Sequence, residues 1–494
     1  MKKILSLVIV ILFLFSMNAS VQSHKLKTNY TDFDPLVDIS VTVKIKAIRL
    51  LEEDLEASAT NKIQTFLVNR IFKRAFFSVD EPSFYVKVII NQEKFISDVY
   101  SKDKYIYDLG WTAELNVPDD QEIVSIKIQL WDTTSGNNNG GSICDISPDT
   151  GSSEDAYDVE IDYNVKTGHW TGDDYLEDKS GYGRLCGTDD GSIYQIDKDC
   201  ELWFDIYQND FDSDDIPYWA EVNEFRTNPE VKDSGDPDND DIPVSWEYNW
   251  GYDPFNFEDH EEIDSDGDSL NNYEEYLVSE WLSDPFRKDV FVELDIMEDG
   301  PDGQKVYFPE NAKELITTAF NRQNVVFHLD MDEMGGLDKI PFKEIISHGD
   351  LNEIYQDYFM HGNDNSFWRR GIFRYGVVVY DVDGPPGYMF RSNAYQLASN
   401  GMEEKAKLPG FDRDIVYASG YMHELGHIFR FWPIPGHDPN SGYPWQLGYW
   451  KNRPYKSCMN YGWVYKLVDY SDGSRENPDI DDWARIDYSG FERD

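Results

Sequence analysis

The chain has 494 residues, which is room for about three domains. It carries 94 acidic against 44 basic residues, a formal charge of −50. This acidity excludes simple binding to the phosphate backbone of nucleic acids and argues against a basic anchor on anionic membranes. Because 40% of the residues are hydrophobic and 15% are aromatic, we expect a folded chain, not the disorder typical of high net charge alone.

The N-terminus has the order of a secretory signal peptide. Met1, Lys2 and Lys3 precede an apolar run over 4–17, and small residues follow up to Ser23. A run of about 14 residues is too short to span a bilayer, and no longer apolar run occurs later. We therefore predict a signal peptide over 1–23, a secreted, extracellular or cell-surface protein, and no transmembrane segment.

Four cysteines occur in the chain, namely Cys144, Cys186, Cys200 and Cys458. In an exported protein they predict one or two disulfides, with Cys186 and Cys200 closing a short loop and the other two paired or free. No C-x-x-C pair occurs, so a cysteine metal site is not expected.

The first part of the chain, 24–207, has the pattern of an all-β domain. Apolar and polar residues alternate over 37–45 and again over 124–130, and 84–90 is a third strand candidate. A stretch with helical spacing lies around 63–75. Loops rich in Gly, Asn and Asp separate these runs. The pattern predicts a β-sandwich with one inserted helix.

Two stretches of this part, 83–88 and 130–132, resemble the C2 family of calcium- and lipid-binding sandwiches. The resemblance implies that Asp80, Asp132 and Asp145 contribute to a calcium site. A C2 calcium loop also has a second aspartate near the position of Thr134, which this chain lacks. The alternative is a structural sandwich with polar loops.

The acidic surplus is most concentrated in and around the second part, 208–288. The segment 205–299 contains 31 acidic and 4 basic residues. Acids recur there three times, at positions 1, 3, 5 and 12 of a repeat of 26 to 28 residues. The three sets are Asp210, Asp212, Asp214 and Glu221; Asp236, Asp238, Asp240 and Glu247; and Asp264, Asp266, Asp268 and Glu275.

This is the spacing of oxygen ligands in an EF-hand-type calcium loop, in which alternate aspartates converge on one ion and the glutamate closes the shell. An EF-hand prefers Gly at position 6, where this chain has Asp215, Asp241 and Ser269. The loops resemble the calcium repeats of thrombospondin type 3 and dockerin modules, which implies calcium binding. The alternative is a solvated acidic linker or a halophile-type surface.

The third part, 289–494, mixes strands and helices. Strands are expected at 290–296, 325–329 and 376–380, and a helix at 311–322. This order predicts an α/β or α+β domain. Its most informative motif is His-Glu-x-x-His, formed by His423, Glu424 and His427. The two histidines are one helical turn apart, so both can reach one zinc ion, and Glu424 can take a proton from a zinc-polarised water.

The motif and the downstream Ser457-Cys458-Met459-Asn460-Tyr461 resemble the metzincin clan of zinc endopeptidases. The resemblance implies that Met459 lies in a turn beneath the metal without binding it, and that Tyr461 ligates zinc or steadies an oxyanion. The clan places its third ligand six residues after the second histidine, where this chain has Pro433. His437 is our first choice for that ligand and Asp438 the second. The alternatives are two histidines packed on a core helix and a methionine that only fills the core.

These observations predict a secreted zinc endopeptidase that hydrolyses peptide bonds of a protein or peptide substrate and is stabilised by calcium. Glu424 would be the general base and Tyr461 the oxyanion donor. A second hypothesis is a non-catalytic, calcium-dependent surface or adhesion protein. A third is a lipid-binding protein that acts through the C2-like sandwich.

Overall fold

The structure is a computed structural model. It describes residues 32–51, 55–56, 82–101, 103–133, 138, 140–151, 156–174, 183–191, 198–233, 235–332, 334–336, 338–362 and 368–491. The predicted signal peptide, the helix expected around 63–75 and Asp80 lie outside these residues.

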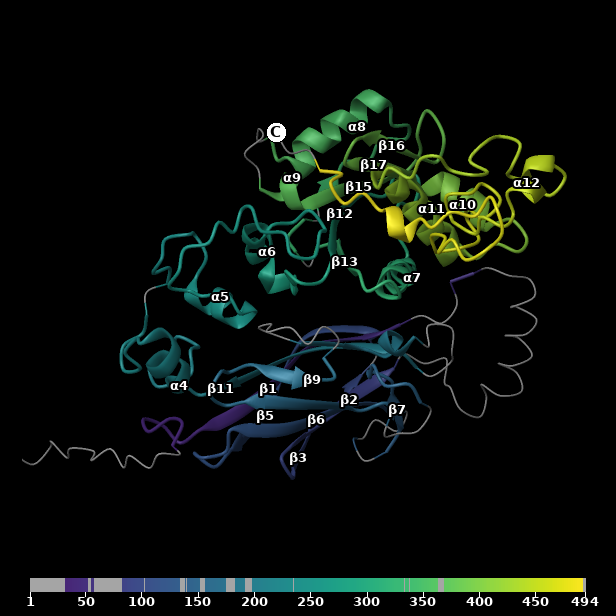
Figure 1. The fold of residues 1–494 in the computed structure, drawn as a ribbon. Helices are drawn as coiled ribbons and strands as arrows, with labels where there is room; N and C mark the ends of the chain where they lie inside the picture. Colours follow the sequence, from purple (N-terminus) through teal and green to yellow (C-terminus); the bar gives the residue numbers. More distant parts are fainter. Residues whose placement is uncertain are drawn as a thin grey trace, which may run out of the picture.

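The first part of the chain forms two antiparallel sheets (Figure 1). One has the strand order β10-β11-β1-β5, and the other has the order β3-β2-β6-β8-β9, with β4 added to β2 and β7 to β6. The strands are β1 Ser40–Leu50, β2 Ser83–Ile90, β3 Glu93–Ile96, β4 Tyr100–Ser101, β5 Tyr105–Asn116, β6 Ile123–Asp132, β7 Ser142–Cys144, β8 Val159–Asn164, β9 Trp170–Gly172, β10 Gly183–Cys186 and β11 Cys200–Gln208. The strands expected at 84–90 and 124–130 are confirmed, and the first strand begins at Ser40, three residues later than expected.

The core of this part lies between the two sheets. Alternate residues of each strand are buried there, such as Val43 of β1, Val88 of β2, Ile128 of β6 and Phe204 of β11. The alternation follows from the pleat, which sends successive side chains to opposite faces. The predicted all-β sandwich is therefore present.

The predicted disulfide between Cys186 and Cys200 is wrong, and all four cysteines are free and buried. Cys186 lies opposite Glu201 across the β10–β11 pair, so Cys200 points to the other face of the sheet. Cys200 joins the sandwich core, where its thiol contacts Cys144. The Cys186 thiol contacts Thr188 and Asn321 instead.

Two of the acids expected from the C2 resemblance are described. Asp132 forms an ion pair of 2.6 Å with Lys198 and accepts a hydrogen bond from the Ser83 amide. Asp145 accepts one from the Ser147 amide. Lys198 thus compensates the charge of Asp132, and the calcium site that the C2 resemblance implies stays a prediction.

The second part consists of short helices that lie between the sandwich and the C-terminal part (Figure 1). They are α4 Tyr218–Ala220, the π turn η4 Glu221–Phe225, α5 Val244–Trp250, α6 Asn272–Leu277 and the 3-10 turn η5 Ser279–Trp281. Their aromatic residues form a common core, in which Trp246 and Trp250 pack with Ala47 and Trp203 of the sandwich and with Val326. A solvated acidic linker would have no such core.

The third part is built on a six-stranded sheet of order β13-β12-β15-β17-β16, with β14 beside β12. All pairs are parallel except β16 with β17, so β16 is an antiparallel edge strand. The strands are β12 Asp289–Met297, β13 Val326–Asp330, β14 Lys339–Ile340, β15 Phe373–Val379, β16 Gly387–Arg391 and β17 Ala394–Ala398. The strands expected at 290–296, 325–329 and 376–380 correspond to β12, β13 and β15.

Helices accompany this sheet, and α11 packs against α7, α10, β16 and β17. They are α7 Glu310–Asn321, α8 His348–Ile354, α9 Arg369–Ile372, α10 Ser399–Ala406, α11 Arg413–Ile428 and α12 Leu447–Lys451, with the short turns η6 Tyr355–Phe359 and η7 Trp483–Arg485. The 3-10 turn η3 Gly187–Asp190 belongs to the first part, between β10 and β11. The helix expected at 311–322 is α7. Among the described residues, no helix is long and apolar enough to cross a membrane.

Candidate metal centres

The long helix α11 positions the first candidate centre. Asp412 caps its N-terminus by accepting a hydrogen bond from the Asp414 amide. The helix is buried along most of its length, and a Cβ atom at Gly426 would lie only 2.4 Å from the Sδ atom of Met459. The chain segment that carries Met459 therefore packs directly against this helix. His423 and His427 lie one turn apart on it.

Three histidines converge beside α11. The Nε2 atoms of His423 and His437 are 3.2 Å apart. The ring of His427 lies 5.0 Å from that of His423 and 4.9 Å from that of His437. One ring nitrogen from each of the three lies within 4.8 Å of the others. This arrangement can hold one metal ion with three imidazole ligands.

His437, and not Asp438, lies against the other two histidines. After α11 the chain turns through Arg430 (φ 59°) and Gly436 (φ 75°) and brings His437 back to the helix. The carboxylate of Asp438 accepts hydrogen bonds from the Asn440 amide at 2.8 Å and the Ser441 hydroxyl at 2.7 Å. It stabilises the next turn, so our second choice of ligand has another role.

The three histidines are held neutral. Burial and the neighbouring His427 lower the pKa of His423 to about 3, and burial lowers the pKa of His427 to about 4. The Nδ1 atom of His423 lies 2.9 Å from the carbonyl oxygen of Cys458, so Nδ1 carries the hydrogen and Nε2 has a free lone pair. Three neutral imidazoles match the protein ligand set of catalytic zinc sites.

Glu424 lies next to this cluster and is 6% exposed. Burial raises its pKa to about 8. Its carboxylate lies against the start of the edge strand β16, where a Cβ atom at Gly387 would be 2.4 Å from Oε1. Glycine therefore leaves room for the carboxylate between α11 and β16.

The segment 452–463 carries the other residues expected at the site. The ring of Tyr461 lies 4.3 Å from that of His437 and 5.8 Å from that of His423. Burial and the charge of Glu424 raise the pKa of Tyr461, so its hydroxyl remains a hydrogen-bond donor near neutral pH.

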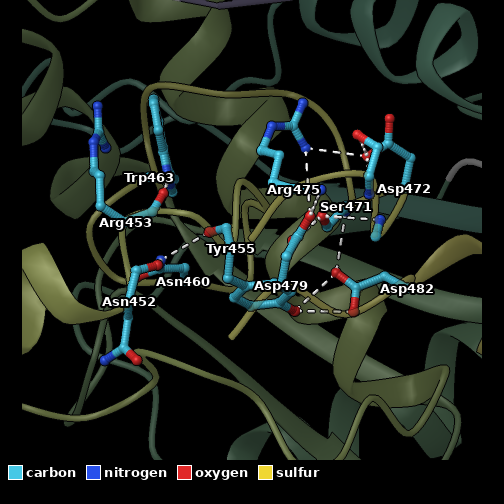
Figure 2. A network of polar contacts seen from close by, with 12 residues as sticks. Asn452, Arg453, Tyr455, Asn460, Trp463, Ser471, Asp472, Arg475, Asp479 and Asp482 are labelled. Carbon is cyan, nitrogen blue, oxygen red and sulfur yellow. Dashed lines mark hydrogen bonds and ion pairs between the residues drawn. The ribbon is translucent and has the colours of Figure 1, made fainter. Parts of the chain in front are cut away.

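A polar network holds this segment in place (Figure 2). The Tyr455 hydroxyl donates to both carboxylate oxygens of Asp482 at 2.9 and 2.8 Å, and Asp482 also accepts from the Ser471 amide. The Asn460 side chain donates to the carbonyl oxygens of Asn452 and Tyr455, both at 2.9 Å. The network anchors the turn that presents the Cys458 carbonyl, Met459 and Tyr461.

The three acidic loops of the second part share one backbone conformation. Position 4 has φ values of 66°, 66° and 75° (Ser213, Asn239, Gly267), and position 6 has 74°, 73° and 74° (Asp215, Asp241, Ser269). In each loop the amide of position 7 donates to the aspartate of position 5. The aliphatic residues at position 7, Ile216, Ile242 and Leu270, are buried. The missing Gly at position 6 thus leaves the turn intact.

Each loop also contains buried carboxylate oxygens without a hydrogen-bond partner. They belong to the same positions, namely position 3 (Asp212, Asp238, Asp266) and position 12 (Glu221, Glu247, Glu275). Burial and the surrounding carboxylates raise the pKa of Asp212 to about 7, of Glu221 to about 8 and of Asp266 to about 9. These buried carboxylates lack hydrogen bonds and repel one another in all three loops. A bound cation would compensate their charge and supply the missing partner.

Sequence reasoning missed one residue of each loop. Asp233 lies with Asp214 and Glu221, and His260 lies with Asp240 and Glu247, each group having its ligand atoms within 4.8 Å. In the third loop, the buried Asp289 raises the pKa of Glu275 through its charge, and its amide donates to Asp268. These residues follow the position-12 glutamate by 12 to 14 residues. The recurrence is visible in the sequence. It was missed because the EF-hand pattern, which guided the choice of ligands, ends at position 12.

Comparison of the chain with known proteins found similar solved structures but no matching family. No family model and no curated protein matches it. A solved C2 domain covers 35% of the chain and 98% of its own length, at 10% identity and a TM-score of 0.18. A C2 domain of plant extended synaptotagmin 1 covers 34% of the chain and 92% of its own length, at 11% identity and a TM-score of 0.17.

Human GIVD cytosolic phospholipase A2 is similar over 35% of the chain, at 10% identity and a TM-score of 0.18, and this chain spans only 17% of that enzyme. The TM-scores and identities of these matches are too low to assign a function to any part of the chain.

Proposed function

We propose that the protein is a secreted zinc-dependent endopeptidase of metzincin type, stabilised by calcium bound in its acidic loops. The observation that carries the proposal is the convergence of His423, His427 and His437 beside the buried Glu424. Zinc in such a site supplies a Lewis acid that polarises a peptide carbonyl and acidifies water. The three neutral imidazoles would hold it.

Glu424 is the proton carrier in this proposal. Its raised pKa, about 8, lies close to neutral pH, where a carboxylate can both take a proton from water and return it to the leaving amine. The ring of Tyr461 lies beside the same histidines, and its hydroxyl stays protonated near neutral pH, so in this proposal Tyr461 donates a hydrogen bond to the developing oxyanion.

The position of the edge strand β16 supports the proposal that the substrate is a peptide. Within the described part of the chain, β16 pairs only with β17, and Gly387 at its start lies against Glu424. An extended peptide that pairs with the open edge would gain backbone hydrogen bonds and pass beside the carboxylate.

The test is cleavage of unfolded casein by the full chain in calcium, compared with Glu424→Gln. The exposed Glu404→Gln is the matched control. We expect the rate to fall by a factor of about 10²–10⁴ in Glu424→Gln, with the zinc content unchanged, and to stay at the wild-type level in Glu404→Gln. Equal cleavage by all three proteins would overturn the role of Glu424. Absence of zinc from the wild type, measured by mass spectrometry of bound metals, would overturn the enzyme class.

A further inference from the structure

The second acidic loop differs from the other two in the residue that completes it. The first loop is completed by the carboxylate of Asp233. The residue next to the third loop is also a carboxylate, Asp289, whose oxygens contact the Asp284 amide and His328. The second is completed by His260, whose Nε2 atom lies 3.3 Å from Oδ2 of Asp240 and 3.4 Å from Oε1 of Glu247. This loop therefore offers a nitrogen where the other two offer oxygen.

His260 is buried deeply and aimed at the loop. It is 1% exposed, and its Nε2 atom faces the carboxylates of Asp240 and Glu247 at distances longer than an ordinary hydrogen bond. Both carboxylate oxygens of Asp238 and of Glu247 are buried and form no hydrogen bond of ordinary geometry. A single imidazolium could not balance this group of carboxylates, so the arrangement calls for a multivalent cation. Beside such a cation, the imidazole is neutral and its lone pair becomes a ligand.

The surroundings of His260 fix its ring for this role. The rings of Tyr252 and Trp246 stand at 88° to it, with centroids 5.0 and 6.0 Å away. The amide nitrogen Nδ2 of Asn272, at the start of α6, lies 2.9 Å from Nδ1. Turning this amide by 180° exchanges its nitrogen for its oxygen, which then keeps the hydrogen on Nδ1 and leaves Nε2 free as a ligand.

The ligand types and spacings select the ion. Calcium takes oxygen ligands, whereas imidazole combined with carboxylates suits zinc and related transition ions. Tetrahedral zinc with bonds of about 2.0–2.1 Å separates its ligand atoms by about 3.3 Å. The distances from Nε2 of His260 to the two carboxylate oxygens have this value.

We propose that the second loop is a structural site for zinc, or a transition ion of the same class, held by Asp238, Asp240, Glu247 and His260. The first and third loops, which offer only oxygen, take calcium. The site joins α5, which carries Glu247, to the segment before α6, and so links the second repeat to the third.

The experiment exchanges the completing residues between loops. His260→Asp gives the second loop the all-oxygen set of the first, and Asp233→His does the reverse. The full-length proteins are equilibrated with excess calcium and limiting zinc, freed of unbound ions, and their metal content is measured by mass spectrometry. His423→Ala removes a ligand of the other proposed zinc site, so its zinc content identifies the equivalent bound there. Circular dichroism checks that each variant is folded.

We expect His260→Asp to lose one equivalent of zinc and gain one of calcium, and Asp233→His to do the opposite. An unchanged zinc content in His260→Asp would overturn the proposal, as would a wild-type second loop that already holds calcium. If His260→Asp fails to fold, Asp233→His tests the proposal alone. If that variant gains no zinc, a histidine in this position does not select zinc, and the proposal is overturned. Loss of zinc in His423→Ala tests the catalytic centre independently.

Discussion

Nε2 of His437 lies 3.2 Å from Nε2 of His423, although the two residues are 14 positions apart and only His423 belongs to the helix α11. Burial lowers the pKa of both side chains, so two uncharged ring nitrogens face one another. Such a contact is unfavourable without a shared proton or cation, and a metal ion held between them removes the conflict.

The first prediction concerns the third zinc ligand. His437→Ala is expected to lose about one equivalent of zinc, because two imidazoles alone do not complete the three-ligand set of a catalytic site. Asp438→Ala should keep its zinc, because this carboxylate stabilises the turn at Ser441. Bound metal is measured after dialysis, together with casein cleavage. Zinc loss in Asp438→Ala but not in His437→Ala would reverse the assignment.

The second prediction concerns Tyr461. Tyr461→Phe keeps the ring beside His437 but removes the hydroxyl, so the transition state loses one donor. We expect kcat to fall by a factor of about 10²–10³ with little change in KM and none in zinc content. Steady-state kinetics on a fluorogenic peptide separate the two constants. A rise in KM with kcat preserved would mean that Tyr461 only binds substrate.

The third prediction concerns calcium removal and pH. The loop carboxyls Asp212, Glu221 and Asp266 have pKa values raised to about 7, 8 and 9, above the values near 4 expected in an unfolded chain. The calcium-free folded state therefore binds more protons than the unfolded state. This contribution to stability is full below about pH 4 and is lost as the pH rises through the raised values.

In chelator, Tm should consequently fall between about pH 5 and pH 9, whereas in excess calcium it should change much less over that range. Thermal unfolding followed by tryptophan fluorescence measures both series. Identical pH dependence with and without calcium would show that these carboxyls do not share a cation.

The fourth prediction concerns the contact between the sandwich and the C-terminal part. Arg49 of β1 lies 3.7 Å from Glu314 of α7 and 3.5 Å from Glu201 of β11, and all three side chains are buried. Arg49→Met leaves these glutamates without one cation and should lower the free energy of unfolding by about 3–5 kcal/mol.

The control is Lys46→Met in the same strand, whose partly exposed pair with Asp205 spans 3.8 Å and contributes at most about 1 kcal/mol. Urea unfolding measures both variants. Equal stability of the two would mean that the interface does not depend on the Arg49 charge.

The fifth prediction concerns the polar network that holds the segment 452–463 (Figure 2). Tyr455→Phe removes the hydroxyl that donates to both oxygens of the buried Asp482, and should cost about 1–3 kcal/mol of unfolding free energy. The exposed Tyr443→Phe is the control and should change stability little. A similar loss in both variants would exclude a specific role for the Tyr455–Asp482 contact.

Local periodicity could be read from the sequence because backbone geometry alone sets it. The alternation over 124–130 became β6, and the helix expected at 311–322 became α7 with bounds shifted by one residue. The spacing of His423 and His427 places both on one helix. The acids at positions 1, 3 and 5 lie in three loops of one conformation, and those at position 12 lie in the helix or turn that follows each loop. Each pattern spans fewer than about 15 residues, so no distant contact was needed to interpret it.

Side-chain direction and distant partners were decided only by the tertiary structure. His437 and Asp438 are neighbours in one turn, and only the path of the chain after α11 sends the imidazole toward His423 and the carboxylate toward Ser441. Cys186 and Cys200 lie close in sequence but point to opposite faces of one sheet.

Asp233, His260 and Asp289 reach their loops from outside the repeated motif, through packing that brings separate segments together. Residue type and spacing thus determined which chemistry the chain carries. The packing of elements far apart in sequence determined which of its side chains meet, because that depends on burying apolar faces across the whole fold.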